Sequence, residues 1–190
     1  VILEKKFERN SLEGIARLKS IPGLDLRILE WSKVNGGGII HAKFFIVDST
    51  QAYVGSQNFD WRSLKHIHEL GLRITDTAVA GNIQSVFDHD WTYTDEKVDY
   101  KRNEALEPGS DISARSYLVA SPWRRNPAGV GDSETELTRL IETAKKELAI
   151  QLLDYNPTTH SRPKRLYPQI DNAFRDAATR GVKIKLMVSH

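Results

Sequence analysis

The chain has 190 residues, of which 39% are hydrophobic and 27% are charged, values that are ordinary for a soluble globular protein. The formal net charge of +2 is too small to indicate a nucleic-acid-binding protein by itself. The lack of cysteine excludes disulfides and a thiol nucleophile, and no apolar run is long enough to cross a bilayer as a helix. None of these features identifies a cellular compartment.

Hydrophobic periodicity predicts alternating helices and strands. In chain order these are a helix over 11–20, strands over 24–31, 44–47, 52–54 and 68–74, a helix over 77–91, a strand over 117–120, a helix over 133–146, a strand over 148–154, a helix over 166–180 and a strand over 182–188. Asp76 and Asp132 are expected to cap the second and third helices, and Gly181 is expected to end the last one. The charged stretch over 94–113 is typical of a linker.

This pattern predicts an α/β fold. The helix between the last two apolar strands forms a βαβ unit, which favours a mixed, largely parallel β-sheet flanked by helices on both faces. The chain stops within a buried-strand pattern and does not begin with Met. We therefore expect it to be a portion of a longer protein.

The most informative segment is an H-x-K-x4-D element followed by a G-S-x-N element. These elements contain His41, Lys43, Asp48, Gly55, Ser56 and Asn58. Side chains alternate between the two faces of a strand, so His41 and Lys43 are expected to project to the same side. An imidazole beside an ammonium on an otherwise apolar strand is unusual in a core, and it favours a site where a phosphate is held and attacked.

A phosphodiester site needs donors for the anionic oxygens, a nucleophile for phosphorus and an acid for the leaving oxygen. Lys43 offers a positive charge with three donors, Asn58 offers an amide donor and Ser56 offers a hydroxyl. His41 is a candidate nucleophile or a candidate acid–base, and the sequence does not separate these roles. Asp48 is expected to be mainly a structural carboxylate in a turn, and only secondarily a proton carrier.

This pair of elements resembles the signature of the phospholipase D superfamily. The resemblance implies that His41, Lys43, Ser56 and Asn58 are phosphate-site residues and that neither a metal ion nor another cofactor is required. It also implies a carboxylate that orients the histidine through its far ring nitrogen, and Glu69 stands where the family usually places it. A plain surface carboxylate is the alternative interpretation of Glu69.

A narrower similarity is to the lysosomal phospholipase D-like exonuclease branch and its microbial relatives. It rests on Asn58-Phe59-Asp60-Trp61-Arg62-Ser63-Leu64, on Leu152-Leu153-Asp154-Tyr155-Asn156-Pro157 and on Tyr167-Pro168-Gln169-Ile170-Asp171. The similarity covers roughly residues 24–92 and 115–190.

Enzymes of this superfamily resemble two similar lobes, each of which contributes one H-x-K motif to a shared cleft. The resemblance implies that residues 1–103 are the C-terminal part of the first lobe and residues 104–190 the N-terminal part of the second. No second H-x-K-x4-D occurs in the chain. The second motif is therefore expected from the missing part of the same polypeptide or, as the alternative, from a homodimer partner.

We thus expect a metal-independent phosphodiester hydrolase or transphosphatidylase that uses a phosphohistidine intermediate and is inactive as this isolated fragment. The substrate is expected to be a phospholipid or a single-stranded nucleic acid, and the candidate substrate-contacting aromatic residues are Trp31, Phe59, Trp61 and Trp123. A non-catalytic scaffold or binding protein that retains one half-site is the alternative, because the second motif is absent.

The other histidines are expected to be ordinary structural or surface residues. They are His66, His68, His89 and His160. No cluster of His, Asp and Glu has the spacing of a zinc site, which supports the expectation that no metal is bound. The tryptophans Trp61, Trp91 and Trp123 are expected mainly to anchor the packing.

Overall fold

The computed structural model describes residues 1–95, 97–98 and 114–189. The predicted linker over 94–113 therefore lies largely outside the described residues, and so does the predicted lobe boundary at residues 103 and 104. The described chain divides into two compact units. The first comprises residues 1–118 and 127–130, and the second comprises residues 119–126 and 131–190.

The first unit contains five strands, four α-helices and a 3-10 helix among its described residues. In chain order they are β1 (Ile2–Glu4), the 3-10 helix (Lys5–Ser11), α1 (Leu12–Lys19), β2 (Arg27–Leu29), α2 (Trp31–Asn35), β3 (Lys43–Val47), β4 (Gln51–Gly55), α3 (Trp61–Lys65), β5 (Gly71–Ile74) and α4 (Thr77–Thr92). β1 and β2 form a parallel pair, and β3, β4 and β5 form an antiparallel sheet in that order.

The second unit is built from two parallel strand pairs and two α-helices among its described residues. Its elements are β6 (Val119–Ala120), a 3-10 helix (Trp123–Arg125), β7 (Gly131–Asp132), α5 (Ser133–Glu142), β8 (Glu147–Leu152), α6 (Gln169–Thr179) and β9 (Lys183–Val188). β6 pairs with β7 and β8 pairs with β9. The predicted βαβ unit is confirmed, because α6 connects the parallel strands β8 and β9.

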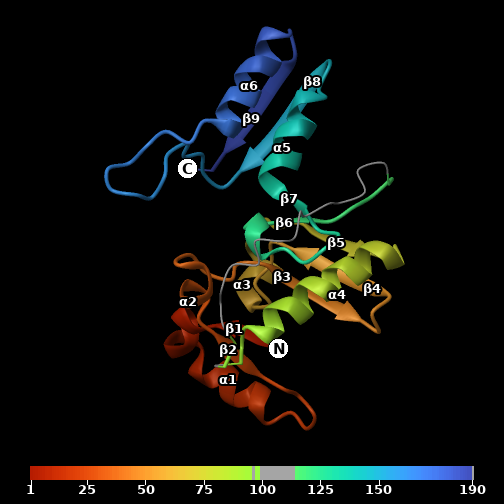
Figure 1. Cartoon of the computed structure of the whole chain (residues 1–190), viewed down its shortest axis with the longest axis vertical. Coiled ribbons are helices and arrows are strands. Elements are labelled where there is room, and N and C mark those ends of the chain that lie inside the picture. The colour runs from red at the N-terminus through yellow and green to blue at the C-terminus, as the bar shows by residue number, and fades with distance from the viewer. Residues whose placement is uncertain (96, 99–113, 190) are drawn as a thin grey trace. The chain divides into compact units, whose positions relative to one another are not determined.

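The α/β class and the predominance of parallel pairs are confirmed, but the pairing is spread over several small sheets within the described residues. The helix α4 lies along one face of the β3–β4–β5 sheet (Figure 1). In that core, the buried residues Val79, Ala80 and Ile83 of α4 pack with the buried Ala52 of β4. Burial of a side chain as large as that of Val79 or Ile83 contributes roughly 1.5–3 kcal/mol to folding. Helical cover of the opposite face remains a prediction.

Helix ends follow the capping chemistry of the sequence. The carboxylate of Asp76 accepts hydrogen bonds from the backbone N–H groups of Ala78 and Val79, at 2.9 and 3.2 Å. Asp132 caps α5 in the same way, accepting from the N–H groups of Glu134 and Thr135. Gly181 adopts a positive φ of 84° just after α6, as expected for a helix C-cap.

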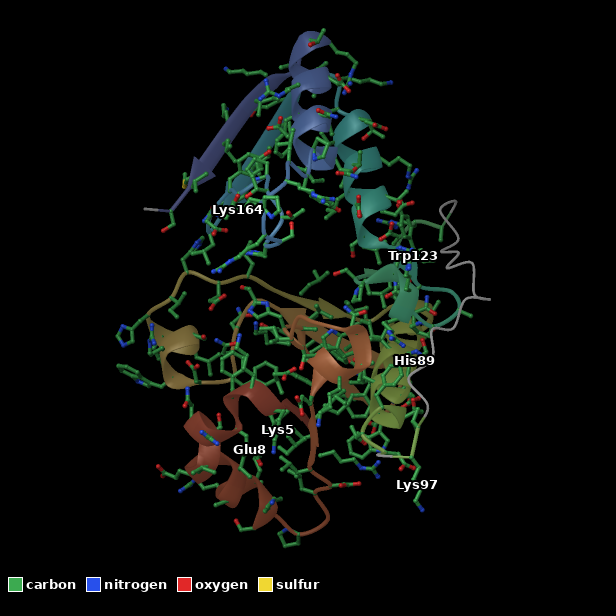
Figure 2. The ribbon with its side chains drawn as sticks, turned by 60° about the vertical axis from the view of Figure 1, so that its left-hand side comes forward. Lys5, Glu8, His89, Lys97, Trp123 and Lys164 are labelled. Atoms are coloured by element: carbon green, nitrogen blue, oxygen red, sulfur yellow. The ribbon has the colours of Figure 1, made fainter. Side chains whose placement is uncertain are left out.

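A second apolar cluster joins the start of the first unit to the end of α4. It contains the buried side chains of Leu29, Trp31, Val34 and Tyr93. The Tyr93 hydroxyl forms a hydrogen bond of 2.8 Å with Nε2 of His89, which stands near the end of α4 (Figure 2). This contact confirms the structural interpretation of His89.

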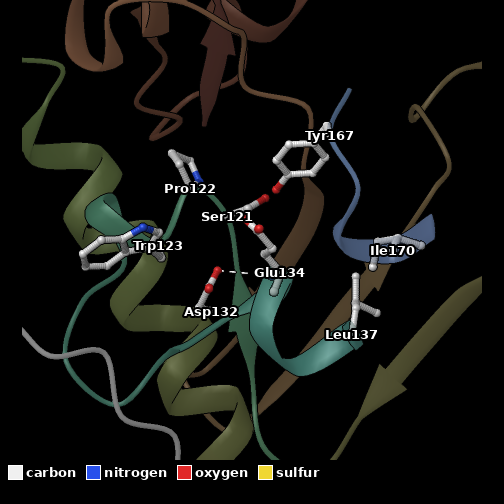
Figure 3. Close-up of a pocket in the computed structure, with 9 residues that line it drawn as sticks. Ser121, Pro122, Trp123, Asp132, Glu134, Leu137, Tyr167 and Ile170 are labelled. Atoms are coloured by element: carbon white, nitrogen blue, oxygen red, sulfur yellow. Dashed lines mark hydrogen bonds between the residues drawn. The ribbon is translucent and has the colours of Figure 1, made fainter. Parts of the chain in front are cut away.

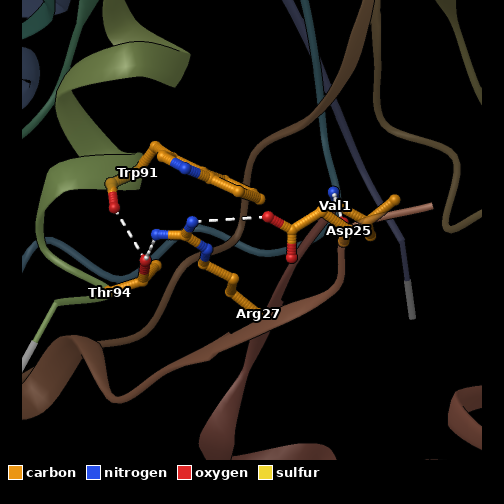
Figure 4. Close-up of polar contacts among 5 residues, drawn as sticks. All are labelled: Val1, Asp25, Arg27, Trp91 and Thr94. Atoms are coloured by element: carbon orange, nitrogen blue, oxygen red, sulfur yellow. Dashed lines mark hydrogen bonds and ion pairs between the residues drawn. The ribbon is translucent and has the colours of Figure 1, made fainter. Parts of the chain in front are cut away.

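Arg27 adds polar contacts next to that cluster. Its guanidinium donates to the Thr94 hydroxyl at 3.0 Å, pairs with the Asp25 carboxylate at 3.3 Å and lies over the Trp91 ring, 4.1 Å from the ring centroid (Figure 4). The indole of Trp91 and the guanidinium of Arg27 therefore connect β2 to the end of α4, which confirms Trp91 as a packing residue.

The predicted strand over 24–31 was wrong at both ends. Only Arg27–Leu29 is a strand, and Trp31–Asn35 forms the short helix α2. Burial of Trp31 and Val34, three residues apart on one helical face, accounts for the change because both side chains join the same core. No helix among the described residues is long and apolar enough to cross a membrane.

The close approach of the Tyr53 ring to Gly71 of β5 can be tested by substitution. A Cβ at Gly71 would lie 2.5 Å from Cζ of Tyr53 and would overlap its hydroxyl, so we expect Gly71→Ala to destabilise the fold by about 1–3 kcal/mol. Gly81→Ala is the matched control: its Cβ meets nothing within 4 Å, and a helical alanine should stabilise the fold by roughly 0.5–1 kcal/mol. Urea unfolding measures both changes. Equal effects of the two variants would contradict the assigned packing.

Candidate functional site

The register of the β3–β4–β5 sheet gathers the motif residues at one end of it. Lys43 pairs with Gly55, and Gly55 pairs with Gly71, so these three residues form one row across the sheet. His41 lies two residues before that row, and Glu69 also precedes it by two residues. The G-S-x-N residues that follow Gly55 leave the sheet at the same end. Segments far apart in the chain are thereby brought to the same end of the sheet.

His41 and Lys43 converge as the sequence predicts. Nζ of Lys43 lies 3.0 Å from Nε2 of His41, and the contact is at the protein surface. An ammonium has only donors, so this contact requires a lone pair on Nε2 and places the ring proton of a neutral His41 on Nδ1. The nitrogen that carries the lone pair is therefore the one beside the positive charge.

The charge of Lys43 is set by two opposing effects. Partial burial lowers the pKa of its ammonium below the ordinary lysine value, and the Glu69 carboxylate opposes that shift. Glu69 therefore acts electrostatically on Lys43. Within the residues described here, no hydrogen bond or ion pair joins Glu69 to His41, so the orienting role of Glu69 remains a prediction.

Ser56 is used to hold the strand ends together. Its hydroxyl accepts from the Leu70 N–H at 3.1 Å and lies 3.3 Å from the Leu70 carbonyl, to which the Ser56 N–H also donates at 3.0 Å. A phosphate contact would compete with these bonds, and the present geometry makes Ser56 a support for the segment that carries Glu69. The side chain of Asn58 is exposed at the same end.

The structure does not bring Asp48 to this end of the sheet. Asp48 and Ser49 have positive φ angles of 51° and 54°, and the Thr50 N–H donates to the Val47 carbonyl at 3.1 Å. These values define a tight hairpin turn, for which Asp is a favoured residue. β3 separates Asp48 from Lys43 by five residues, or roughly 16 Å of strand. The expected turn role fits this position, and direct contact with the phosphate does not.

The hydroxyl of Tyr53 also lies at this end of the sheet, and the sequence did not predict its position. Its hydroxyl donates to the Gln57 side chain at 2.7 Å, and a Cβ at Gly55 would lie 2.9 Å from that hydroxyl. A side chain at Gly55 would therefore overlap the side chains of Tyr53 and Gln57. The alternation of side chains along a strand could have indicated this contact, because it places Tyr53 and Gly55 on one face of the sheet.

Two of the proposed substrate-contacting aromatic residues in the first unit are accessible. Phe59 and Trp61 are 59% and 68% exposed, whereas Trp31 is buried in the core and cannot serve this purpose. Trp61 does not anchor the packing as predicted, because its only described ring contact is with the exposed His66, at 4.3 Å. Phe59 packs edge-on to Phe45, with the ring centroids 5.9 Å apart. Aromatic surface therefore borders the segment that follows Asn58.

No group of three or more His, Cys, Asp or Glu residues that could hold a metal ion occurs in the described parts of the chain.

Comparison with known proteins identifies the family. Residues 1–91 match the family described as "Cardiolipin synthase, PLD-like domain". The 5'-3' exonuclease PLD3 of Xenopus laevis is 31% identical over an alignment of 183 residues, which covers 88% of this chain and 37% of that protein. Phospholipase D Z of Dictyostelium discoideum is 30% identical over 88% of this chain and 44% of its own length. Probable phospholipase D F09G2.8 of Caenorhabditis elegans is 29% identical over 87% of this chain and 33% of that protein.

The chain belongs to the phospholipase D superfamily, and the resemblance inferred from its motif is confirmed. By name, these relatives are an exonuclease and phospholipases D. The chain spans less than half the length of these curated relatives, at 37%, 33% and 44%.

The lowered pKa of Lys43 predicts how anion binding depends on pH. Dimethyl phosphate keeps a constant charge, so its affinity should fall as pH rises through the Lys43 pKa, which lies below the ordinary lysine value. Glu69→Gln removes the charge that opposes this lowering and should move the loss of binding to lower pH. Lys43→Arg, whose guanidinium stays charged, should retain binding at high pH. Titration calorimetry at a series of alkaline pH values measures the affinity of each variant for dimethyl phosphate. The same alkaline loss in Lys43→Arg would contradict the assignment to lysine deprotonation.

Proposed function

We propose that the chain is part of a phosphodiester hydrolase or transphosphatidylase in which His41 and Lys43 form one half of the catalytic site. The carrying observation is the 3.0 Å approach of His41 Nε2 and Lys43 Nζ at the exposed end of the sheet. A phosphoryl group bound there would meet a lone pair and a positive charge from adjacent directions. The amide of Asn58 would supply a further donor to a phosphoryl oxygen.

In the proposed first step, the bound phosphoryl group takes the Lys43 ammonium away from Nε2 of His41, and the freed lone pair attacks phosphorus. The N–P bond forms as the bond from phosphorus to the leaving oxygen breaks, and that oxygen takes a proton from a second group. Lys43 stabilises the charge that builds on the phosphoryl oxygens, so the proposal requires no metal ion. Water then attacks phosphorus and gives its proton to the second group as the N–P bond breaks, which regenerates His41.

The second acid–base group is proposed to be the histidine of another H-x-K motif. This chain has a single H-x-K-x4-D element, and that motivates the assignment. One imidazole cannot be both the nucleophile at phosphorus and the proton donor to the leaving oxygen in the same step. The remainder of the polypeptide is the proposed source, which makes the two units described here portions of two lobes and leaves this fragment inactive alone. A second copy of the chain is the other source, and size-exclusion chromatography separates the two.

The substrate is proposed to be a phospholipid or a single-stranded nucleic acid. The names of the relatives include both an exonuclease and phospholipases D, and the exposed rings of Phe59 and Trp61 suit either a base or an apolar chain. A non-catalytic binding protein with one half-site is the competing proposal, supported by the single motif. A second H-x-K in the complete protein, together with turnover, would exclude it.

Replacing His41 in the complete polypeptide tests the proposal. His41→Ala should lower turnover of single-stranded DNA or phosphatidylcholine by about a thousandfold or more, because no other group can form the N–P bond. His160→Ala, at an exposed position of the second unit, is the matched control and should retain activity. Mass spectrometry of a rapidly quenched reaction should locate on His41 a phosphoryl group that keeps the second ester substituent of the substrate. Turnover that is unchanged in His41→Ala would refute the proposed nucleophile.

A further inference from the structure

The carboxylates of a pocket in the second unit already have partners within the chain. The pocket has a volume of about 360 Å³, and Trp123, Tyr167, Asp132 and Glu134 are among the residues that line it (Figure 3). The Asp132 carboxylate accepts from the Glu134 N–H at 3.2 Å, and the Tyr167 hydroxyl hydrogen-bonds to the Glu134 side chain. These bonds make both carboxylates structural groups at the start of α5. Trp123, which the sequence predicted to anchor the packing, is 42% exposed at this pocket.

The first unit has a tyrosine on the same sheet face as Lys43. Lys43 lies directly opposite Gly55 in the register of β3 and β4, and Tyr53 precedes Gly55 by two residues. Opposite residues and residues two apart share a face of a sheet, so Tyr53, Gly55 and Lys43 lie on one face. Phe45, which is opposite Tyr53, stacks on the tyrosine ring with the centroids 5.4 Å apart. This stacking holds the Tyr53 ring in place on that face.

Two glycines leave the space that the Tyr53 hydroxyl occupies. A Cβ at Gly55 would lie 2.9 Å from the hydroxyl oxygen, and a Cβ at Gly71 would lie 2.8 Å from Cε2 of the ring. Gly55 pairs with both Lys43 and Gly71, so the two glycines belong to the row of the sheet that contains Lys43. The tyrosine hydroxyl therefore lies at the end of the sheet where the motif residues gather, and a larger residue at either glycine would displace it.

The Tyr53 hydroxyl is bonded to the segment that carries Asn58. It donates to Oε1 of Gln57 at 2.7 Å, and Gln57 is the x position of the G-S-x-N element. Gln57 is half-buried, whereas its neighbours Ser56 and Asn58 are exposed. The bond thus holds the residue between them against the sheet, and the Asn58 side chain stays open to solvent.

A second bond fixes the chain on the other side of Asn58. The Asp60 carboxylate accepts from the Ser63 N–H at 2.9 Å and so caps α3. Asn58 is therefore flanked by two anchored residues, Gln57 and Asp60. A donor on a free loop loses conformational entropy when it binds an anion, and anchors on both sides reduce that loss. The bond between Tyr53 and Gln57 can therefore raise the affinity of Asn58 for an anion without touching the anion.

We propose that Tyr53 is a positioning residue of the candidate phosphate site, which acts through Gln57 to fix the Asn58 amide where it donates to a phosphoryl oxygen. This inference rests on the phosphate-binding role proposed for Asn58. It assigns to Tyr53 and Gln57 a part in anion binding that a purely structural hydrogen bond would not have.

Titration calorimetry of the 190-residue chain with dimethyl phosphate tests this role. Tyr53→Phe keeps the ring and its stacking and removes only the hydroxyl, and it should weaken binding by about fivefold. Gln57→Met removes the acceptor and should have the same effect. Gln51→Met is the matched control and should leave the affinity unchanged, because Oε1 of Gln51 accepts from Arg73 at 2.6 Å at the opposite end of β4. Unchanged affinity in Tyr53→Phe would overturn the proposal.

The Asn58→Ala background separates positioning from a general loss of structure. Asn58→Ala should itself weaken dimethyl phosphate binding by about fivefold, and adding Tyr53→Phe should cause no further loss, because Tyr53 acts only through Asn58. An additional loss of the same size in the double variant would show that the hydroxyl stabilises the fold in general, and the positioning role would be refuted.

Binding and turnover distinguish a failure of this inference from a failure of the proposed function. Dimethyl phosphate binding does not require the second H-x-K motif, whereas turnover by the complete polypeptide does. Turnover that persists in His41→Ala, together with weaker binding in Tyr53→Phe, would refute the nucleophile and support the positioning role. Full affinity in Asn58→Ala would refute the phosphate-binding role of Asn58 and, with it, the role of Tyr53.

Discussion

The in-register pairing of β3, β4 and β5 is the constraint on which the candidate site depends. Backbone hydrogen bonds align Lys43 with Gly55 and Gly55 with Gly71, so the residues that flank this row leave the sheet at the same end. A slip of one residue in β3 would turn Lys43 to the face that packs on α4, where a charged group would be buried. The apolar residues on that face, Phe44 and Ile46, therefore fix the orientation of the polar residues as well.

The electrostatics of the site follow from this placement. At this end of the sheet, partial burial lowers the pKa of Lys43. The nearby Glu69 carboxylate opposes that shift. The contact with Lys43 Nζ directs Nε2 of His41 toward the ammonium. Ser56 anchors the segment before β5 through Leu70 and so helps to set the position of Glu69. An ammonium and an imidazole nitrogen thus lie together at this end of the sheet.

The sequence predicted the parts of the structure that depend on local patterns. Alternation identified the β3–β4 hairpin and the shared side of His41 and Lys43, and side-chain caps identified the start of α4. It did not predict α2, whose formation depends on tertiary burial of Trp31 and Val34, or the place of Tyr53 over Gly71. The separation of Asp48 from His41 and Lys43 depends on the length of β3 and the position of the turn after it. The pocket of the second unit joins residues distant in the chain, which no short motif reveals.

The tautomer of His41 tests the central claim most directly. Nitrogen-15 NMR of the imidazole distinguishes a protonated from an unprotonated ring nitrogen. With Nε2 facing the Lys43 ammonium, the account predicts an unprotonated Nε2 and a protonated Nδ1 at neutral pH, with the Nε2 signal shifting when dimethyl phosphate is added and the His160 signals unchanged. A protonated Nε2 that does not respond to the phosphodiester would contradict the account.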